Sequence, residues 1–420
     1  MKLSIFSIVL LLSFIKFVSS KCFDFDSYSN FEVTECGELK EFIKTPVVDR
    51  TIKIEINTDK SKPGMCNTGG KVNMFEIDFT CDKNTSNKTC EKARNAFETA
   101  GMIISSAIKL KKKIHVNATF TKFCGVFLNC SGGSSPIGYG IPARFIQLKD
   151  EDSVIRLYPQ ALVKQFDSLN HPEYNKYDIT ALFNSESTAY WFSGDPNPPT
   201  YNQIDFTLVI LHEFIHGLGL ITLWVDYFNP TPEGLVPFPS FLKNPNGFTD
   251  YNGTITFTGF EESVFDKYLV FTDNDNNKDP EKYLTSIREK INSFAGGPEA
   301  NTKFDNSSSF ITSFVNSSNY NYAKDLLTKA TIPRSIGFLP HNAKNNNDII
   351  IVETSLKPLI TGSSLSHLDN DTYVDTPDFL MRYRAPRGIS LETLYLANGG
   401  DKDNKCAIGP KTIEILETLG

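Results

Sequence analysis

The sequence predicts an α+β fold, and three observations support this prediction. Short segments with alternating polar and apolar residues indicate β-strands, and a long amphipathic segment between two of them indicates a helix. A second, more apolar helical segment carries the motif H-E-x-x-H. Proline-rich and asparagine-rich stretches then begin near residue 221 and continue to about residue 360. We therefore expect a first half of strands and helices, followed by a long insertion.

The elements of the first half follow from the spacing of apolar residues. One buried helix face is expected in residues 93–108, where apolar side chains recur at steps of three and four. Strand-like alternation or strand-forming composition predicts strands in residues 50–58, 113–120, 143–148 and 178–185. The stretch "FSGDPNPPTYNQ", residues 192–203, contains three prolines and is expected to be a surface loop.

The stretch "LVILHEFIHGLGLITLW", residues 208–224, contains the residues with the clearest chemistry. Asp205 is a good N-cap for a helix that continues through this motif. On that helix His212 and His216 lie one turn apart and can face one metal ion. Glu213 would lie beside the water bound to such an ion and could act as a general base. Gly219 allows the chain to turn at the end of the helix.

Two histidines do not complete a catalytic zinc site, which needs three protein ligands and an open position. In the compact motif H-E-x-x-H-x-x-G-x-x-H the third ligand would stand at Thr222, which is a poor zinc ligand. The remaining histidines are His115, His171, His341 and His367. A carboxylate from a downstream helix is the alternative, and the candidates are Glu261, Glu262 and Asp266.

The sequence "HEFIHGLG", a long insertion and then "SHLDNDTYVDTPDFLM" together resemble leishmanolysin, a metzincin, and secreted leishmanolysin-like proteins of fungi and bacteria. The resemblance covers mainly residues 200–224 and 362–385. It implies a zinc ion bound by three ligands, with one general base, a glycine that turns the chain and a Met-turn beneath the metal. These residues would be His212, His216 and His367 for zinc, Glu213 as base, Gly219 at the turn and Met381 in the Met-turn.

The same resemblance implies a domain layout. A metzincin-like catalytic domain would combine a mixed β-sheet with an active-site helix, a long insertion and a C-terminal sub-domain that holds the Met-turn. The expected segments are a signal peptide (1–20), an N-terminal segment (21–45), an N-terminal catalytic sub-domain (46–220), the insertion (221–360) and the C-terminal sub-domain (361–420).

The first 20 residues predict secretion. Lys2 precedes a mostly apolar run, and small residues at 18–20 fit a signal-peptidase site. A membrane anchor is the alternative, for which the run is short and is interrupted by Lys16. All eight cysteines follow residue 20, so up to four disulfides are expected. Sequons for N-glycosylation stand at Asn84, Asn87, Asn117, Asn129, Asn252, Asn306, Asn316 and Asn370.

Charge and hydropathy limit the partners that we expect. Without residues 1–20 the chain has 40 basic and 49 acidic residues, which argues against a nucleic-acid partner. No later segment is long and apolar enough to span a membrane. We expect a secreted zinc endopeptidase that hydrolyses peptide bonds with metal-activated water and binds a peptide or protein substrate along a sheet edge. The alternative is a secreted or surface binding or adhesion protein that keeps the fold without turnover.

Overall fold

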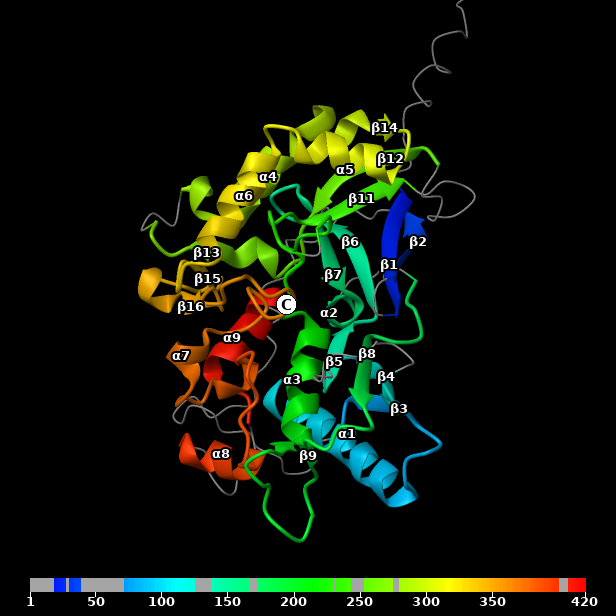
Figure 1. The fold of residues 1–420 in the computed structure, drawn as a ribbon, viewed down its shortest axis with the longest axis vertical. Coiled ribbons are helices and arrows are strands. Elements are labelled where there is room, and N and C mark those ends of the chain that lie inside the picture. Colours follow the sequence, from blue (N-terminus) through cyan, green and yellow to red (C-terminus); the bar gives the residue numbers. More distant parts are fainter. Residues whose placement is uncertain are drawn as a thin grey trace, which may run out of the picture.

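A mixed four-stranded β-sheet lies beside the motif-bearing helix (Figure 1). The structure is a computed structural model, and it describes residues 19–27, 30–38, 72–124, 137–166, 173–229, 231–242, 253–274, 279–399 and 407–420. The expected strand at 50–58 and the candidate ligand His171 lie outside these residues.

The strands of this sheet, in spatial order, are β3 (Phe75–Cys81), β4 (Ile114–Thr121), β8 (Ile179–Asn184) and β5 (Gly138–Pro142). The first three run parallel, and β5 is antiparallel to β8 at the edge of the sheet. Buried and half-buried residues alternate along β4, as a strand with one face in the core requires. The strands expected at 113–120 and 178–185 are therefore confirmed.

Two helices pack together beside this sheet, α1 (Asn87–Ala107) and α3 (Phe206–Leu218). Helix α1 begins after Ser86, whose side chain accepts a hydrogen bond from the Thr89 amide. The helix expected at 93–108 is confirmed, because most of its apolar face is buried. The ring of Phe97 lies 5.3 Å from that of Phe183 in β8 and 6.0 Å from that of Phe214 in α3. Sheet and helices therefore share one core.

A second sheet is antiparallel throughout and extends the N-terminal half. Its strands, in spatial order, are β2 (Asn30–Glu38), β1 (Ser19–Ser27), β6 (Arg144–Lys149) and β7 (Ile155–Pro159), which leads into α2 (Gln160–Val163). The strand expected at 143–148 is thus confirmed as β6. The loop expected at 192–203 separates the short parallel pair β9 (Tyr190–Trp191) and β10 (Ile204–Asp205).

The expected insertion contains two small sheets and several helices. One sheet consists of β11 (Phe238–Leu242), β12 (Ile255–Glu261) and β14 (Thr302–Phe304), and the other of β13 (Leu269–Phe271), β15 (Ile336–Phe338) and β16 (Ile350–Ile351). The helices are α4 (Leu284–Asn292), α5 (Ser307–Val315) and α6 (Tyr320–Lys329), with short 3₁₀ turns that include Asp266–Tyr268. The insertion packs around its own aromatic cluster, formed by Phe257, Phe260, Phe294, Phe310 and Phe314.

The C-terminal part consists of short helices on the side of α3 away from β3, β4, β5 and β8 (Figure 1). They are α7 (Asn370–Tyr373), a 3₁₀ turn (Phe379–Met381), α8 (Leu391–Ala397) and α9 (Pro410–Leu419). Leu368 forms single β-bridges to both Val352 and Arg382, so the end of the insertion and the 3₁₀ turn flank the same segment. None of the helices in the described ranges is long and apolar enough to cross a membrane.

Candidate metal centre

Helix α3 presents the two motif histidines from one face. The Asp205 side chain caps its N-terminus by accepting a hydrogen bond from the Thr207 amide at 2.9 Å. Its C-terminus is Gly219, with a φ of 130°, a backbone conformation that favours glycine. The chain can therefore leave the helix after Leu218 and pass close to the His216 ring, which contacts the Leu220 carbonyl.

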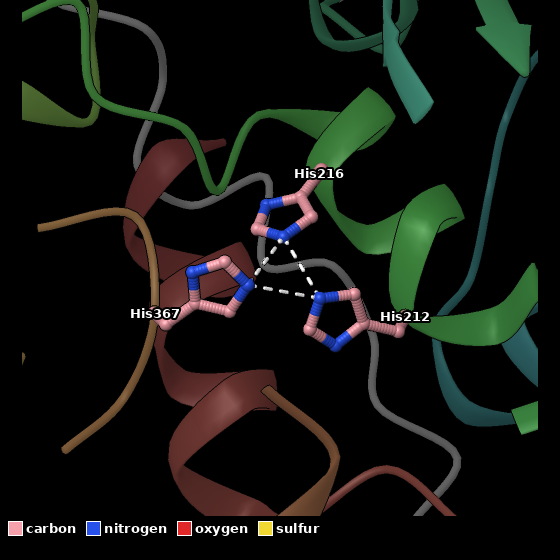
Figure 2. A group of neighbouring side chains, drawn as sticks. All are labelled: His212, His216 and His367. Atoms are coloured by element: carbon pink, nitrogen blue, oxygen red, sulfur yellow. Dashed lines mark hydrogen bonds between the residues drawn. The ribbon is translucent and has the colours of Figure 1, made fainter. Parts of the chain in front are cut away.

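Three histidine rings converge in front of α3 (Figure 2). The Nε2 atom of His212 lies 3.0 Å from that of His367 and 3.1 Å from that of His216. The Nε2 atoms of His216 and His367 are 3.2 Å apart. The structure thus brings together residues that are 151 positions apart in the sequence.

Each of the three rings uses its other nitrogen to bind a backbone carbonyl. The Nδ1 atoms of His212, His216 and His367 lie 2.7, 2.6 and 2.9 Å from the carbonyl oxygens of Leu380, Leu220 and Ser363, respectively. A carbonyl oxygen can only accept a hydrogen bond, so every Nδ1 carries a proton. In a neutral ring, every Nε2 then carries a lone pair.

Burial favours the neutral form of these rings. It lowers the pKa of His212 to about 4 and, together with the neighbouring His212, the pKa of His216 to about 3. Burial and the two other rings also lower the pKa of His367 well below its ordinary value. Three lone pairs therefore face one another with no proton among them, an arrangement that a cation stabilises.

The three nitrogens fit a zinc ion. Imidazole nitrogens bind zinc at about 2.0–2.1 Å, and in a tetrahedral site two of them then lie about 3.3 Å apart. The observed separations of 3.0–3.2 Å are close to this value. Backbone carbonyls that fix the outer nitrogen of each ligand are also typical of histidine–metal sites.

Glu213 is held beside the histidines by the edge strand β5. Its Oε2 atom accepts a hydrogen bond from the Gly140 amide at 2.7 Å. Its Oε1 atom has no hydrogen-bond partner among the residues that the structure describes. Burial raises the pKa of Glu213 to about 8, whereas a cation at the neighbouring histidines would favour the carboxylate. One carboxylate oxygen is thus fixed and the other can accept a proton.

Gly140 belongs to the site, although it was not among the residues singled out from the sequence. A Cβ atom at this position would lie 2.5 Å from the Glu213 carbonyl oxygen and 2.7 Å from the Glu213 Cβ. Only glycine therefore allows β5 to approach α3 this closely. The pair of glycines in "PIGYGIP" was the available signal, because glycine inside a strand often marks a close backbone approach.

Met381 lies fully buried in the 3₁₀ turn that follows the third histidine. Its carbonyl oxygen accepts a hydrogen bond from the Leu368 amide at 2.8 Å. Leu380, the preceding residue, provides the carbonyl that binds His212. The 3₁₀ turn therefore contacts both the helix ligand and the segment of the third ligand.

The other candidate histidines lie away from this cluster. His115 is in β4, with its Nδ1 atom 3.4 Å from Glu76. His341 is exposed, and its Nδ1 atom lies 3.4 Å from the Thr418 hydroxyl. Among the described residues, His212, His216 and His367 form a group of potential metal ligands whose ligand atoms all lie within 4.8 Å of one another.

The three carboxylates that were considered as alternative ligands have other partners. Glu261, Glu262 and Asp266 are all buried, and none of them joins the histidine cluster. They accept hydrogen bonds from the side chains of Gln147, Arg156 and Thr222, respectively. The gluzincin-type ligand set is therefore not assembled in this structure.

Comparisons with known proteins place the chain in a family. A curated relative, "Uncharacterized protein PB7E8.01" of Schizosaccharomyces pombe, is 28% identical over 386 residues, which cover 87% of this chain. The match covers 65% of that relative, so the chain spans just under two thirds of its length. No solved structure matches the chain. The family model described as SPBPB7E8-like matches residues 22–420, and the chain therefore belongs to the SPBPB7E8-like family.

Proposed function

We propose that this chain is a secreted zinc endopeptidase of the leishmanolysin-like metzincin type. The observation that carries the proposal is the convergence of three neutral imidazole nitrogens beside a carboxylate that has one free oxygen. Zinc bound by His212, His216 and His367 would polarise the scissile carbonyl and lower the pKa of a water molecule.

Glu213 supplies the proton transfer that peptide hydrolysis needs. The Gly140 amide holds its Oε2 atom, which fixes the orientation of the carboxylate and would leave Oε1 for the water. Oε1 accepts the proton of the attacking water, and the resulting carboxylic acid donates it to the nitrogen of the leaving amine. A binding protein without turnover would have no use for such a group, which favours the enzyme over the adhesion alternative.

Strand β5 is suited to hold an extended peptide. Within the described ranges its strand partner is β8, and β5 ends the sheet next to α3. A peptide that adds to a free sheet edge gains backbone hydrogen bonds with little dependence on its side chains. Because Gly140 of β5 contacts Glu213, a peptide on this edge would lie beside the general base.

Disulfide bonding is consistent with secretion. Cys81 and Cys90 form a disulfide that joins the end of β3 to the first turn of α1. Cys22 and Cys124 are also disulfide-bonded. Such bonds persist in oxidising compartments, which agrees with the proposed signal peptide at residues 1–20.

The test compares wild type with Glu213→Gln in zinc content and in digestion of a peptide library. The amide keeps the shape of the side chain but cannot accept the water proton. Hydrolysis should fall by about 10²–10⁴-fold, the contribution of a general base. Zinc should stay at one ion per chain, because Glu213 is not among the ligands. Glu289→Gln, at an exposed position on α4, is the control and should keep full activity.

Two results would count against the proposal. Near-normal hydrolysis by Glu213→Gln would remove Glu213 from the reaction. Zinc binding by the wild type without cleavage of any library peptide would favour the adhesion or binding alternative.

A further inference from the structure

Thr222 stands where the compact metzincin motif would carry its third ligand. In this structure it forms hydrogen bonds with Asp266 and Ser366 instead. Its hydroxyl donates a hydrogen bond to Asp266 Oδ1 at 2.6 Å. Its amide donates to the Ser366 hydroxyl at 3.2 Å, and Ser366 directly precedes the ligand His367. Thr222, at the start of the insertion, therefore links Asp266 to the segment of the proposed third ligand.

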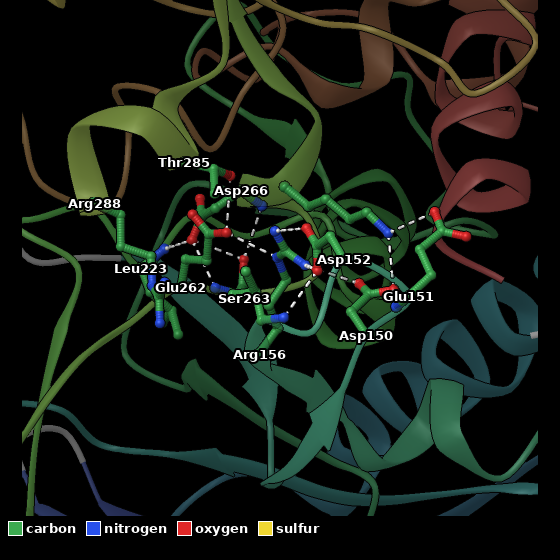
Figure 3. Close-up of polar contacts among 12 residues, drawn as sticks. Asp150, Glu151, Asp152, Arg156, Leu223, Glu262, Ser263, Asp266, Thr285 and Arg288 are labelled. Atoms are coloured by element: carbon green, nitrogen blue, oxygen red, sulfur yellow. Dashed lines mark hydrogen bonds and ion pairs between the residues drawn. The ribbon is translucent and has the colours of Figure 1, made fainter. Parts of the chain in front are cut away.

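Asp266 holds the chain that follows helix α3. Besides the Thr222 hydroxyl, it accepts hydrogen bonds at its Oδ2 atom from the Leu223 amide at 3.0 Å and from the Ser263 amide at 2.9 Å (Figure 3). Its side chain is fully buried. A buried carboxylate is costly unless neutral donors or cations satisfy it. Asp266 forms no ion pair within the described ranges, so these donors are what stabilises its buried carboxylate.

The segment held by Asp266 also orients a helix ligand. The Leu220 carbonyl, two residues before Thr222, accepts the hydrogen bond from His216 Nδ1 at 2.6 Å. One short segment thus binds the ring of the second ligand and the residue next to the third. A displacement of this segment would move both Nε2 atoms.

We propose that Asp266 is a positioning residue of the metal centre. From the insertion it fixes residues 222 and 223, and through them it orients His216 and His367. The role rests on the proposed zinc site. It also gives the insertion a function at that site, because the insertion provides a carboxylate that acts on the proposed ligands from outside the ligand set.

Glu262 provides a matched control. Like Asp266, it is a fully buried acid at the same end of the insertion. Its Oε1 atom accepts hydrogen bonds from Arg156 Nε at 2.8 Å and from the Thr285 hydroxyl at 2.9 Å (Figure 3). Neither partner belongs to a segment that contains or orients a histidine ligand. Loss of Glu262 should therefore weaken the fold without a specific effect on zinc.

The experiment measures zinc affinity by competition with a chromogenic chelator, together with the thermal unfolding of the metal-free protein. Asp266→Asn keeps one acceptor oxygen and replaces the other by an NH₂ donor, so it cannot accept hydrogen bonds from the Thr222 hydroxyl on one side and from the Leu223 and Ser263 amides on the other. We expect zinc binding to weaken by about 10–100-fold, as for other groups that orient metal ligands. Glu262→Gln should change zinc affinity less than about threefold, because no ligand depends on it. The absorption spectrum with Co²⁺ should change in Asp266→Asn and stay as in wild type in Glu262→Gln.

Equal zinc affinities of Asp266→Asn and wild type would overturn the positioning role, and so would equal losses in Asp266→Asn and Glu262→Gln. If Asp266→Asn does not fold, Thr222→Val and Ser366→Ala remove single hydrogen bonds of the same connection. Unchanged zinc affinity in both of these variants would overturn the role as well. A wild-type protein that binds no zinc would instead overturn the proposed function, and the positioning role with it.

Discussion

At the scale of single residues, the orientation of each histidine ring is set by the main chain. Three carbonyl oxygens fix three protons on Nδ1, and this leaves three lone pairs directed at one point. The carbonyls come from distant parts of the chain, because Leu220 follows α3 while Ser363 and Leu380 flank the third histidine. The donor set is therefore a property of the folded chain rather than of the motif alone.

The third histidine gives a direct test of this donor set. His367→Ala removes one of the three proposed ligands, so zinc affinity should fall by more than about 100-fold, beyond the loss of a group that only orients a ligand. Peptide hydrolysis should disappear with it. His341→Ala changes an exposed histidine near Thr418 and should leave zinc content unchanged. Equal zinc affinities of the two variants, measured by chelator competition, would rule out His367 as a ligand.

At the scale of elements, the contact between α3 and β5 positions the residues of the candidate site. Helix α3 places His212, Glu213 and His216 in one turn, and β5 supplies the amide that holds the carboxylate. Their close approach depends on Gly140, where a side chain would overlap with the Glu213 backbone. The geometry of the general base is thus set by the contact between a helix and an edge strand.

Gly140→Ala should separate these two elements. The added methyl group must push β5 away from α3, and such overpacking costs about 1–3 kcal/mol of folding free energy. Hydrolysis should fall by more than the loss of folded protein explains, because Glu213 loses its hydrogen-bond donor. Zinc should remain bound. Gly194→Ala is the control: its Cβ has open space, but its φ of 91° should still cost about 1–2 kcal/mol. Comparable activity losses in the two variants would show that the α3–β5 contact has no special role.

The features that could be predicted from the sequence are those that depend on the local spacing of residues. Helix α3, its cap Asp205 and the shared face of His212 and His216 all follow from residues close together in the chain. The place of His367 depends on bridges from Leu368 to Val352 and Arg382, and no local pattern encodes such pairings. The prediction of His367 as the third ligand therefore required the resemblance to leishmanolysin. Asp266 was considered as a ligand, but the donors that surround it arise only from tertiary packing.

At the scale of the whole molecule, a buried charge network attaches the insertion to the N-terminal half. Arg156 of β7 pairs with Glu262 of the insertion and with Asp150 and Asp152 of the β6–β7 turn (Figure 3). Lys267 of the insertion pairs with Asp150 in turn. Breaking one partner of such a network leaves a buried charge without compensation. The insertion is thus fixed against the sheet that contains β6 and β7.

This network predicts a loss of stability in acid. Burial alone would raise the pKa of Asp150, but the charges of Lys267 and Arg156 outweigh it and hold this pKa below the ordinary 3.8. The stabilisation is therefore present above pH 3.8 and is lost as the pH falls through the lower folded value. Urea unfolding of wild type should show this decrease. Asp150→Asn should show a flatter pH dependence there, and be about 3–5 kcal/mol less stable at pH 7.

Glu289→Gln is the matched control for the acid titration, since it changes an exposed acid of α4 outside this network. It should keep the pH dependence of the wild type. If the unfolding free energy of Asp150→Asn falls with decreasing pH as steeply as that of the wild type, this aspartate does not contribute to the acid sensitivity.

The distance of 151 positions between His216 and His367 also affects how the site assembles. Closing a flexible loop of this length costs about 3 kcal/mol more than closing the six-residue loop of a compact motif. The packing of the insertion's aromatic residues into the main hydrophobic core offsets part of this cost, because it holds both ends of the insertion near α3. During synthesis, moreover, the set of histidines is complete only after the whole insertion has left the ribosome. If the chain is the proposed zinc endopeptidase, a nascent chain lacks the third proposed ligand, and thus the complete site for cleavage, while most of the molecule is still being made.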